Sequence, residues 1–177
     1  MLFFLSYGAL IFGLLFYNNF TATSAIINEL TNVAIEQKYY LYFLLLGIGA
    51  TIITTILNRK NFTSDFNYFQ ELFLILLFTL LFQLASLLWA FAIYFVVWHS
   101  LPSLIDQIKV LYGNSSKINL INYIRSSFVY WLISILGLVI LYFSTQYFAI
   151  NFITLFFAFL AAITVPHVIV MYFLNKN

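Results

Sequence analysis

The chain has 177 residues, of which 64% are hydrophobic and only 7% are charged. A soluble domain carries about 25% charged residues, and no water-soluble fold of this length covers so much apolar surface. The net charge of +2 is too small for a nucleic-acid-binding surface, and the absence of cysteine excludes disulfides and thiolate metal sites. The composition therefore predicts an integral membrane protein with one transmembrane helical domain over residues 1–177.

Apolar runs along the chain are candidates for membrane-spanning helices, which need about 20 residues. In chain order they are Leu2–Tyr17, Tyr39–Leu57, Leu72–His99, Ser126–Phe143 and Phe148–Leu174. In the polar segment 18–38, Ala and Ile recur at intervals, and we expect this segment to be a loop that contains a short interfacial helix. Pro166 interrupts the last run, because proline removes a helical hydrogen bond.

The third run is too long for one straight span. At 1.5 Å per residue, its 28 residues would extend about 42 Å, well beyond the hydrocarbon core of roughly 30 Å. The run is either one strongly tilted helix or two helices that fold back near residues 83–86.

The basic residues decide between these alternatives, because short cytoplasmic loops are rich in Lys and Arg. If the third run forms one helix, the first two clusters of basic residues lie on opposite sides of the membrane. If it forms two helices, all clusters lie on one side. The uncharged loop 144–147 then faces outward. We therefore predict an all-α bundle of about six transmembrane helices with both termini in the cytoplasm. The clusters are Arg59 with Lys60, then Lys109, Lys117 and Arg125, then Lys176.

The chain has two histidines, and each ends or interrupts an apolar run. Under the six-helix topology, His99 and His167 both lie in the cytoplasmic half of the membrane, where they are able to face one another. Neutral imidazole is a good ligand for iron, zinc or copper, although an ordinary site has three or four protein ligands. The alternative is that His99 caps a helix end and that His167 bonds the Ala162 carbonyl freed by Pro166.

Other polar or small residues carry weaker signals. Gly47 and Gly49, with Ala50, predict a close contact between helices. Glu71 and Asp106 are lone acids at the ends of spans, and we expect them to be solvated rather than catalytic. The sequence has no glycine-rich phosphate loop, no Ser/His/Asp arrangement and no acid pair inside a span that would indicate proton-driven transport.

Two segments resemble those of the Brp/Blh family of membrane-bound β-carotene 15,15′-dioxygenases. Residues 90–103, AFAIYFVVWHSLPS, resemble the family's YF-x-x-WHS segment, and residues 157–167, FAFLAAITVPH, resemble its closing T-x-PH segment. The two segments occur in the family's order and at about its spacing. The resemblance covers most of the chain, and the region before Glu71 matches only in hydrophobic character.

The resemblance implies an enzyme that cleaves the central double bond of β-carotene, or of a related polyene, with O₂ to give retinal. It implies Fe(II) as the cofactor and His99 and His167 as iron ligands, with no catalytic residue beyond the metal ligands. The resemblance assigns no role as an iron ligand to Ser103 or Asp106. It further implies a bacterial inner (cell) membrane and a functional link to a microbial rhodopsin.

The chain departs from the family's pattern upstream of these segments. Family members usually have an earlier helix with a His-Gly-x-x-Asp type element, whereas no histidine precedes residue 99 here. We therefore expect the chain to be the C-terminal portion of a longer family member, with half of the iron site. The alternative function is that of a non-catalytic membrane protein that binds a lipid or polyene, or scaffolds a partner.

Overall fold

The computed structural model describes residues 2–59, 67–148 and 150–174, and these ranges form helices joined by short connections, with no β-strand among them. The predicted all-α fold is confirmed. The chain divides into two compact units, Met1–Pro102 and Ser103–Asn177, which are described in turn. The single transmembrane domain over residues 1–177 stays a prediction.

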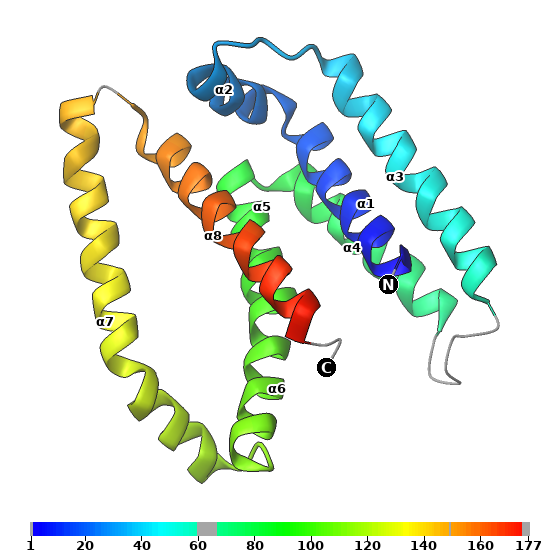
Figure 1. Cartoon of the computed structure of the whole chain (residues 1–177). Coiled ribbons are helices and arrows are strands. Elements are labelled where there is room, and N and C mark those ends of the chain that lie inside the picture. The colour runs from blue at the N-terminus through cyan, green and yellow to red at the C-terminus, as the bar shows by residue number, and fades with distance from the viewer. Residues whose placement is uncertain (1, 60–66, 149, 175–177) are drawn as a thin grey trace. The chain divides into compact units, whose positions relative to one another are not determined.

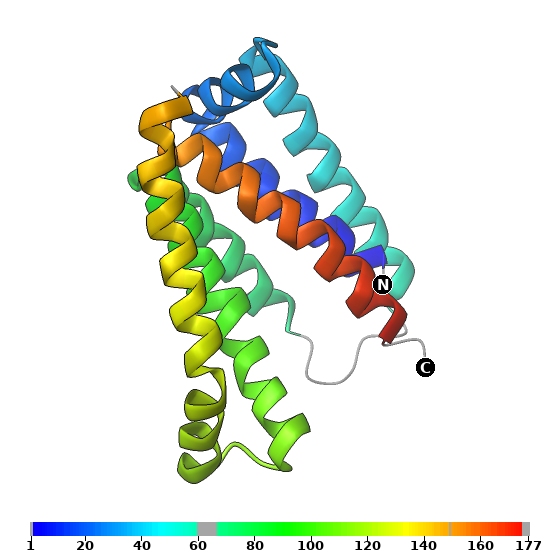
Figure 2. The same cartoon turned by 60° about the vertical axis from the view of Figure 1, so that its left-hand side comes forward.

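The first unit is a succession of helical segments packed around its first helix. In chain order these are α1 (Leu2–Asn18), α2 (Phe20–Thr31), α3 (Gln37–Asn58), α4 (Tyr68–Leu84), α5 (Leu87–Ile93) and the π-helix η1 (Tyr94–Ser100). Helix α1 contacts α2, α3, α4 and α5, and Figures 1 and 2 both show it alongside α3. Helix α2 is the short helix expected within residues 18–38.

Helices α1 and α3 pack closely because glycine stands at the contact on both of them. A Cβ atom at Gly47 of α3 would lie 3.0 Å from the Cα atom of Leu10, and one at Gly13 of α1 would lie 3.1 Å from the Cα atom of Leu44. Gly47 therefore permits the close helix contact that the sequence predicted. The same prediction was wrong for Gly49, because no atom of another described helix lies within 4 Å of its Cβ position.

The long apolar run is broken at Ala85 and Ser86, within the region where a fold-back was predicted. Both residues have extended backbone, with ψ of 148° and 157°, and the chain turns back between α4 and α5 (Figures 1 and 2). The side-chain amide of Asn19 donates a hydrogen bond of 3.0 Å to the carbonyl of Phe82. This bond satisfies a carbonyl in the last turn of α4, where no intrahelical donor remains.

The second unit contains a helical hairpin followed by one more helix. The helices are α6 (Leu101–Tyr112), which begins two residues before the unit boundary, α7 (Lys117–Phe148) and α8 (Phe152–Leu174). Helix α6 ends at Tyr112 and is followed by Gly113, whose φ of 81° lies in the left-handed region that glycine adopts most readily. Helix α7 contacts α8, and both are seen in Figure 1.

Two boundaries in this unit differ from the sequence prediction. The expected span 126–143 is the middle of the longer helix α7, which takes in the expected loop 144–147 because no proline interrupts it. The last helix is not interrupted at Pro166, since the backbone of α8 is helical from Phe152 to Leu174. Apolar membrane helices tolerate proline when the freed backbone groups find other partners.

The predicted number of about six transmembrane helices is not confirmed. Among the described residues, three helices are long and apolar enough to cross a membrane, and a bent pair is a fourth if it counts as one span. The number differs because α4, with 17 residues, and the segment Phe152–Ala162 of α8 count only as shorter apolar helices, and because α1 qualifies only together with α2. The three helices are Gln37–Asn58, Leu87–Tyr112 and Lys117–Thr145, and the pair bent by 95° is Leu2–Asn18 with Phe20–Thr31.

Replacing Gly47 with Ala should destabilise the first unit, whereas the same change at Gly49 should not. The new methyl group at position 47 would press on the backbone of Leu10, and overpacking of this kind costs about 1–3 kcal/mol. At position 49 the methyl group meets no atom, and alanine should stabilise the helix by about 0.5–1 kcal/mol. Thermal unfolding in detergent micelles measures both changes. Equal stability of the two variants would contradict a glycine-dependent contact.

Candidate functional site

His99 lies on η1, the seven-residue π-helix between α5 and α6. The N–H of Leu101 donates to the carbonyl of Val96, five residues back, instead of to the residue four back as in an α-helix. The π-helix is part of one continuous helix, Leu87–Tyr112, which extends beyond His99. The alternative in which His99 caps a helix end is therefore wrong, because no helix ends there.

The imidazole of His99 belongs to a row of aromatic rings on one side of this helix. The ring centroids of Phe95 and His99 are 5.3 Å apart with an interplanar angle of 32°, and those of Phe91 and Phe95 are 5.4 Å apart at 17°. The side chain of His99 is exposed. Its ring nitrogens make no hydrogen bond within the described part of the chain.

A second set of rings fixes η1 against the core of the first unit. The ring of Tyr94 lies 5.3 Å from that of Phe78 and 6.2 Å from that of Phe12, both in edge-on arrangements. Trp98 contacts the same Phe78 ring edge-on at 5.2 Å. Edge-to-face pairs at such distances contribute about 0.5–1.5 kcal/mol beyond the burial of their area. Tyr94 and Trp98 thus anchor the helix that carries His99.

His167 lies on α8 in the other unit, and its side chain is outside the described residues. The pairing of His99 with His167 stays a prediction. Within the residues that the structure describes, no three side chains of His, Cys, Asp or Glu lie close enough together to hold a metal ion. The imidazole of His99 fits iron in its donor chemistry, but the described donors do not complete a site.

The two lone acids differ in their surroundings. Asp106 is solvated as predicted, with 73% of its side chain exposed, and its carboxylate pairs with the ammonium of Lys109 at 3.1 Å. Glu71 is half-buried in the first turn of α4, so it is less solvated than we expected.

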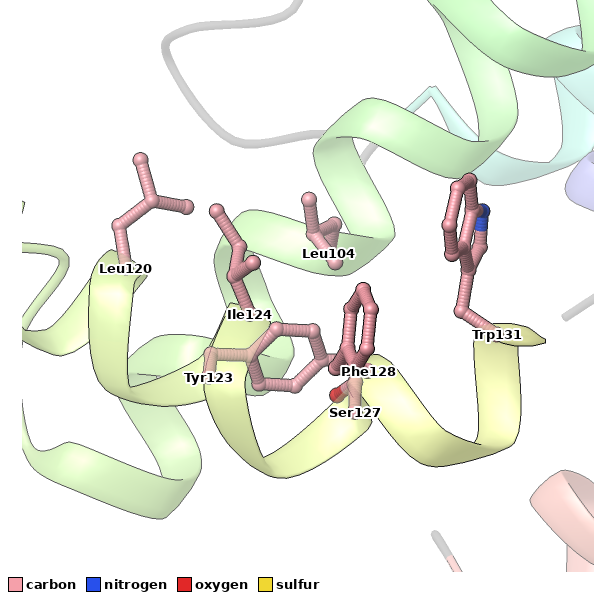
Figure 3. A pocket seen from close by; sticks show the side chains of 7 residues that line it. All are labelled: Leu104, Leu120, Tyr123, Ile124, Ser127, Phe128 and Trp131. Carbon is pink, nitrogen blue, oxygen red and sulfur yellow. The ribbon is translucent and has the colours of Figure 1, made fainter.

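The second unit contains an apolar groove that the sequence interpretation missed. Its cavity of about 440 Å³ lies within the usual range of small-molecule sites, roughly 300–1,000 Å³. Figure 3 shows the lining side chains gathered along α7 and opposite α6. They recur every three or four residues, and this helical period was the signal that could have identified them. The groove is lined by Leu104, Leu120, Tyr123, Ile124, Ser127, Phe128 and Trp131.

Hydrogen bonds hold the hairpin that forms this groove. The hydroxyl of Tyr123 donates to Oε1 of Gln107 at 2.9 Å, which joins α7 to α6. At the turn, the amide of Asn119 donates to Oδ1 of Asn114 at 2.8 Å and to the carbonyl of Tyr112 at 3.4 Å. These bonds join α6 and α7 near their turn.

The fold and the site define a helical membrane protein with an exposed imidazole on an aromatic helix face. The chain matches the family model described as beta-carotene 15,15′-dioxygenase over residues 1–175. The chain therefore belongs to the β-carotene 15,15′-dioxygenase family, as its resemblance over residues 90–103 and 157–167 predicted. Membership places it among oxygenases that act on carotenoids with O₂. No curated protein and no solved structure matches the chain.

Replacing Tyr123 with Phe should loosen the α6–α7 hairpin. The variant loses the hydrogen bond to Gln107, and such a bond contributes about 0.5–1.5 kcal/mol. Tyr130→Phe is the matched control, because this ring is 74% exposed on the same helix and its hydroxyl makes no hydrogen bond among the described residues. Thermal unfolding of the reconstituted protein measures the difference. Equal stability of Tyr123→Phe and Tyr130→Phe would show that the hydrogen bond to Gln107 does not stabilise the hairpin.

Proposed function

We propose that this chain is an iron-dependent oxygenase that cleaves the central double bond of β-carotene, or of a related polyene, with O₂ to give retinal. The family match over residues 1–175 is the observation that carries the proposal. In such a cleavage the carbon–carbon double bond breaks and each half ends in an aldehyde. Both oxygen atoms of O₂ are then accounted for by the two products.

We propose His99 and His167 as the iron ligands that this chain supplies. The exposed imidazole of His99, whose nitrogens make no hydrogen bond to a described residue, supports this role, because neutral imidazole suits Fe(II). Bound iron would supply the activation of O₂, which protein side chains alone do not provide. The described residues contain no group of three donors, so we expect further ligands besides these two.

We propose that the apolar groove of the second unit binds the hydrocarbon chain of the polyene. Its lining is apolar except for the hydroxyls of Tyr123 and Ser127 and the indole N–H of Trp131. The rings of Phe128 and Trp131 offer flat faces to a flat conjugated chain. From Leu120 to Trp131 the wall formed by α7 extends about 16 Å at 1.5 Å per residue. The substrate would enter from the bilayer, where a polyene dissolves.

The order of the helices supports six membrane crossings, with both termini in the cytoplasm of a bacterial inner (cell) membrane. If α1, α3, α4, the continuous helix Leu87–Tyr112, α7 and α8 each cross once, then the segments with Arg59, with Lys109 and Lys117, and with Lys176 share one side. This distribution follows the positive-inside rule. Retinal released there would be available to a microbial rhodopsin, which we propose as the functional partner.

A second candidate function is that of a non-catalytic membrane protein that binds a lipid or polyene, or scaffolds a partner. It is favoured by the absence of a three-donor group within the described ranges. The two functions share the apolar groove and differ in what the histidines do. An oxygenase needs both imidazoles for turnover, whereas a binding protein keeps its ligand without them.

Retinal should accumulate when the intact gene is expressed in cells that make β-carotene, and His99→Ala or His167→Ala should abolish it. Polyene bound to the purified variants should remain unchanged, because the groove is intact. Asp106→Asn is the control, since this exposed carboxylate pairs with Lys109 and is not a proposed ligand. Chromatography of the extracted retinoids gives the yields. Retinal production by either histidine variant at the level of the unmodified protein would overturn the ligand assignment, and carotenoid binding without retinal would favour the second function.

Trp131→Ala should weaken polyene binding through the loss of an aromatic face in the groove. A contact of this kind contributes about 1 kcal/mol, which corresponds to roughly fivefold in affinity. Trp89→Ala is the matched control, because Trp89 is exposed on α5 and outside the groove. The amount of carotenoid that co-purifies with each variant reports the effect. Equal retention by both variants would show that the polyene binds elsewhere.

A further inference from the structure

The apolar groove of the α6–α7 hairpin continues along α7 to a lysine. Lys117 is the first residue of α7, and the groove residues Ile124 and Trp131 follow it at intervals of seven residues. Seven residues are close to two helical turns, so residues at this interval differ by only about 20° around the axis. Lys117 therefore lies on the groove face of α7. Leu120, the first groove residue of this helix, is about 5 Å further along the axis, and Figure 3 shows Leu120 and Trp131 at opposite ends of the α7 wall.

The hairpin has no acidic side chain left to pair with Lys117. The residue is exposed, and it makes no ion pair or hydrogen bond with a described residue. Asp106 is the one acid in the sequence of the hairpin, and its carboxylate pairs with the ammonium of Lys109 at 3.1 Å. A negatively charged group would therefore complement this end of the groove.

Helix α7 is longer than a membrane span, and its charges lie at the end that begins with Lys117. Its 32 residues extend about 48 Å, whereas the hydrocarbon core is roughly 30 Å thick. Residues 126–148 contain no Asp, Glu, Lys or Arg, while Lys117 and Arg125 lie before them. When α7 crosses a membrane, the uncharged part with Phe128 and Trp131 occupies the hydrocarbon, and Lys117 reaches the headgroup region. The groove thus has a cationic end and an apolar, aromatic end.

We propose that this groove binds a single-chain anionic amphiphile, a long-chain carboxylate. Its carboxylate would pair with Lys117, and its hydrocarbon chain would lie along α7 toward Trp131. This face extends about 21 Å between the two residues, and the cavity of about 440 Å³ has the size of a small-molecule site. We assign it one chain rather than the paired chains of a phospholipid. Competition with the polyene for the groove rests on the proposed function, whereas binding of the carboxylate does not.

The probe is cis-parinaric acid, a conjugated polyene carboxylate that fluoresces strongly only in apolar surroundings. It is titrated into the full chain in a nonionic detergent, against micelles without protein. Its methyl ester has the same chain without the charge. Lys117→Gln removes the cation and Lys117→Arg retains it. Arg125→Gln is the matched control, because Arg125 belongs to the same helix but lies about 100° from Ile124 around the axis.

Lys117→Gln should weaken binding of the acid by about two- to fivefold, the range of an exposed ion pair, and should leave binding of the ester unchanged. Lys117→Arg should bind the acid like the unmodified chain, and so should Arg125→Gln. High salt should weaken binding of the acid to the unmodified chain but not to Lys117→Gln, because salt screens exposed charges. Trp131→Ala should weaken acid and ester alike, since this side chain would contact the hydrocarbon chain.

Equal affinity of Lys117→Gln and the unmodified chain for the acid would refute the proposal. Equal weakening by Arg125→Gln would also refute it, because the hairpin would then attract anions without a defined site. Displacement of the probe is measured with oleate and with phosphatidylglycerol in mixed micelles. Oleate should displace the probe at the lower concentration, and equal displacement by the phospholipid would contradict the assignment of one chain. The titrations need no turnover, so absence of retinal from the unmodified protein refutes the proposed function and leaves this test unaffected.

Discussion

Backbone N–H and C=O groups inside a bilayer find no water, so each of them must be bonded within the protein. This constraint explains the helical fold and also the form of its irregularities. At the break between α4 and α5, the amide of Asn19 reaches from the α1–α2 connection to the carbonyl of Phe82. At η1, the N–H of Leu101 bonds five residues back to Val96. Even hydroxyls along the helices return to the backbone, as Thr51 does to the carbonyl of Gly47 at 2.8 Å.

The break between α4 and α5 and the π-helix η1 also determine the position of the candidate site. The first unit fixes η1 through the rings of Tyr94 and Trp98 on Phe78, and α1 supports that core because Gly47 allows α3 to approach it closely. The face of η1 that does not pack on this core carries the imidazole of His99. Because an imidazole inside a bilayer is costly unless it is used, we propose a ligand role for His99 rather than a purely structural one.

Membership of the β-carotene 15,15′-dioxygenase family gives these features a chemical context. The substrate is a long hydrocarbon, so recognition by hydrogen bonds has little to act on, and shape and aromatic surface must provide it. The groove along α7 has such a surface, with Phe128 and Trp131 in its wall. In the proposed function, the imidazoles would serve O₂ chemistry and the groove would bind the polyene, so the two roles would rest on different residues.

The sequence by itself determined the apolar all-α class, helices α1 and α3, the break near residues 83–86 and the two histidines of interest. Hydropathy and charge suffice for these features because they are local or depend on the bilayer alone. Only the tertiary structure decided that α5 continues through η1 into α6, that α7 takes in the expected loop 144–147, and that Gly47 but not Gly49 meets another helix. These outcomes depend on which atoms face each other across helices. A single-sequence pattern of hydrophobicity does not contain that information, because in this chain nearly every face is apolar.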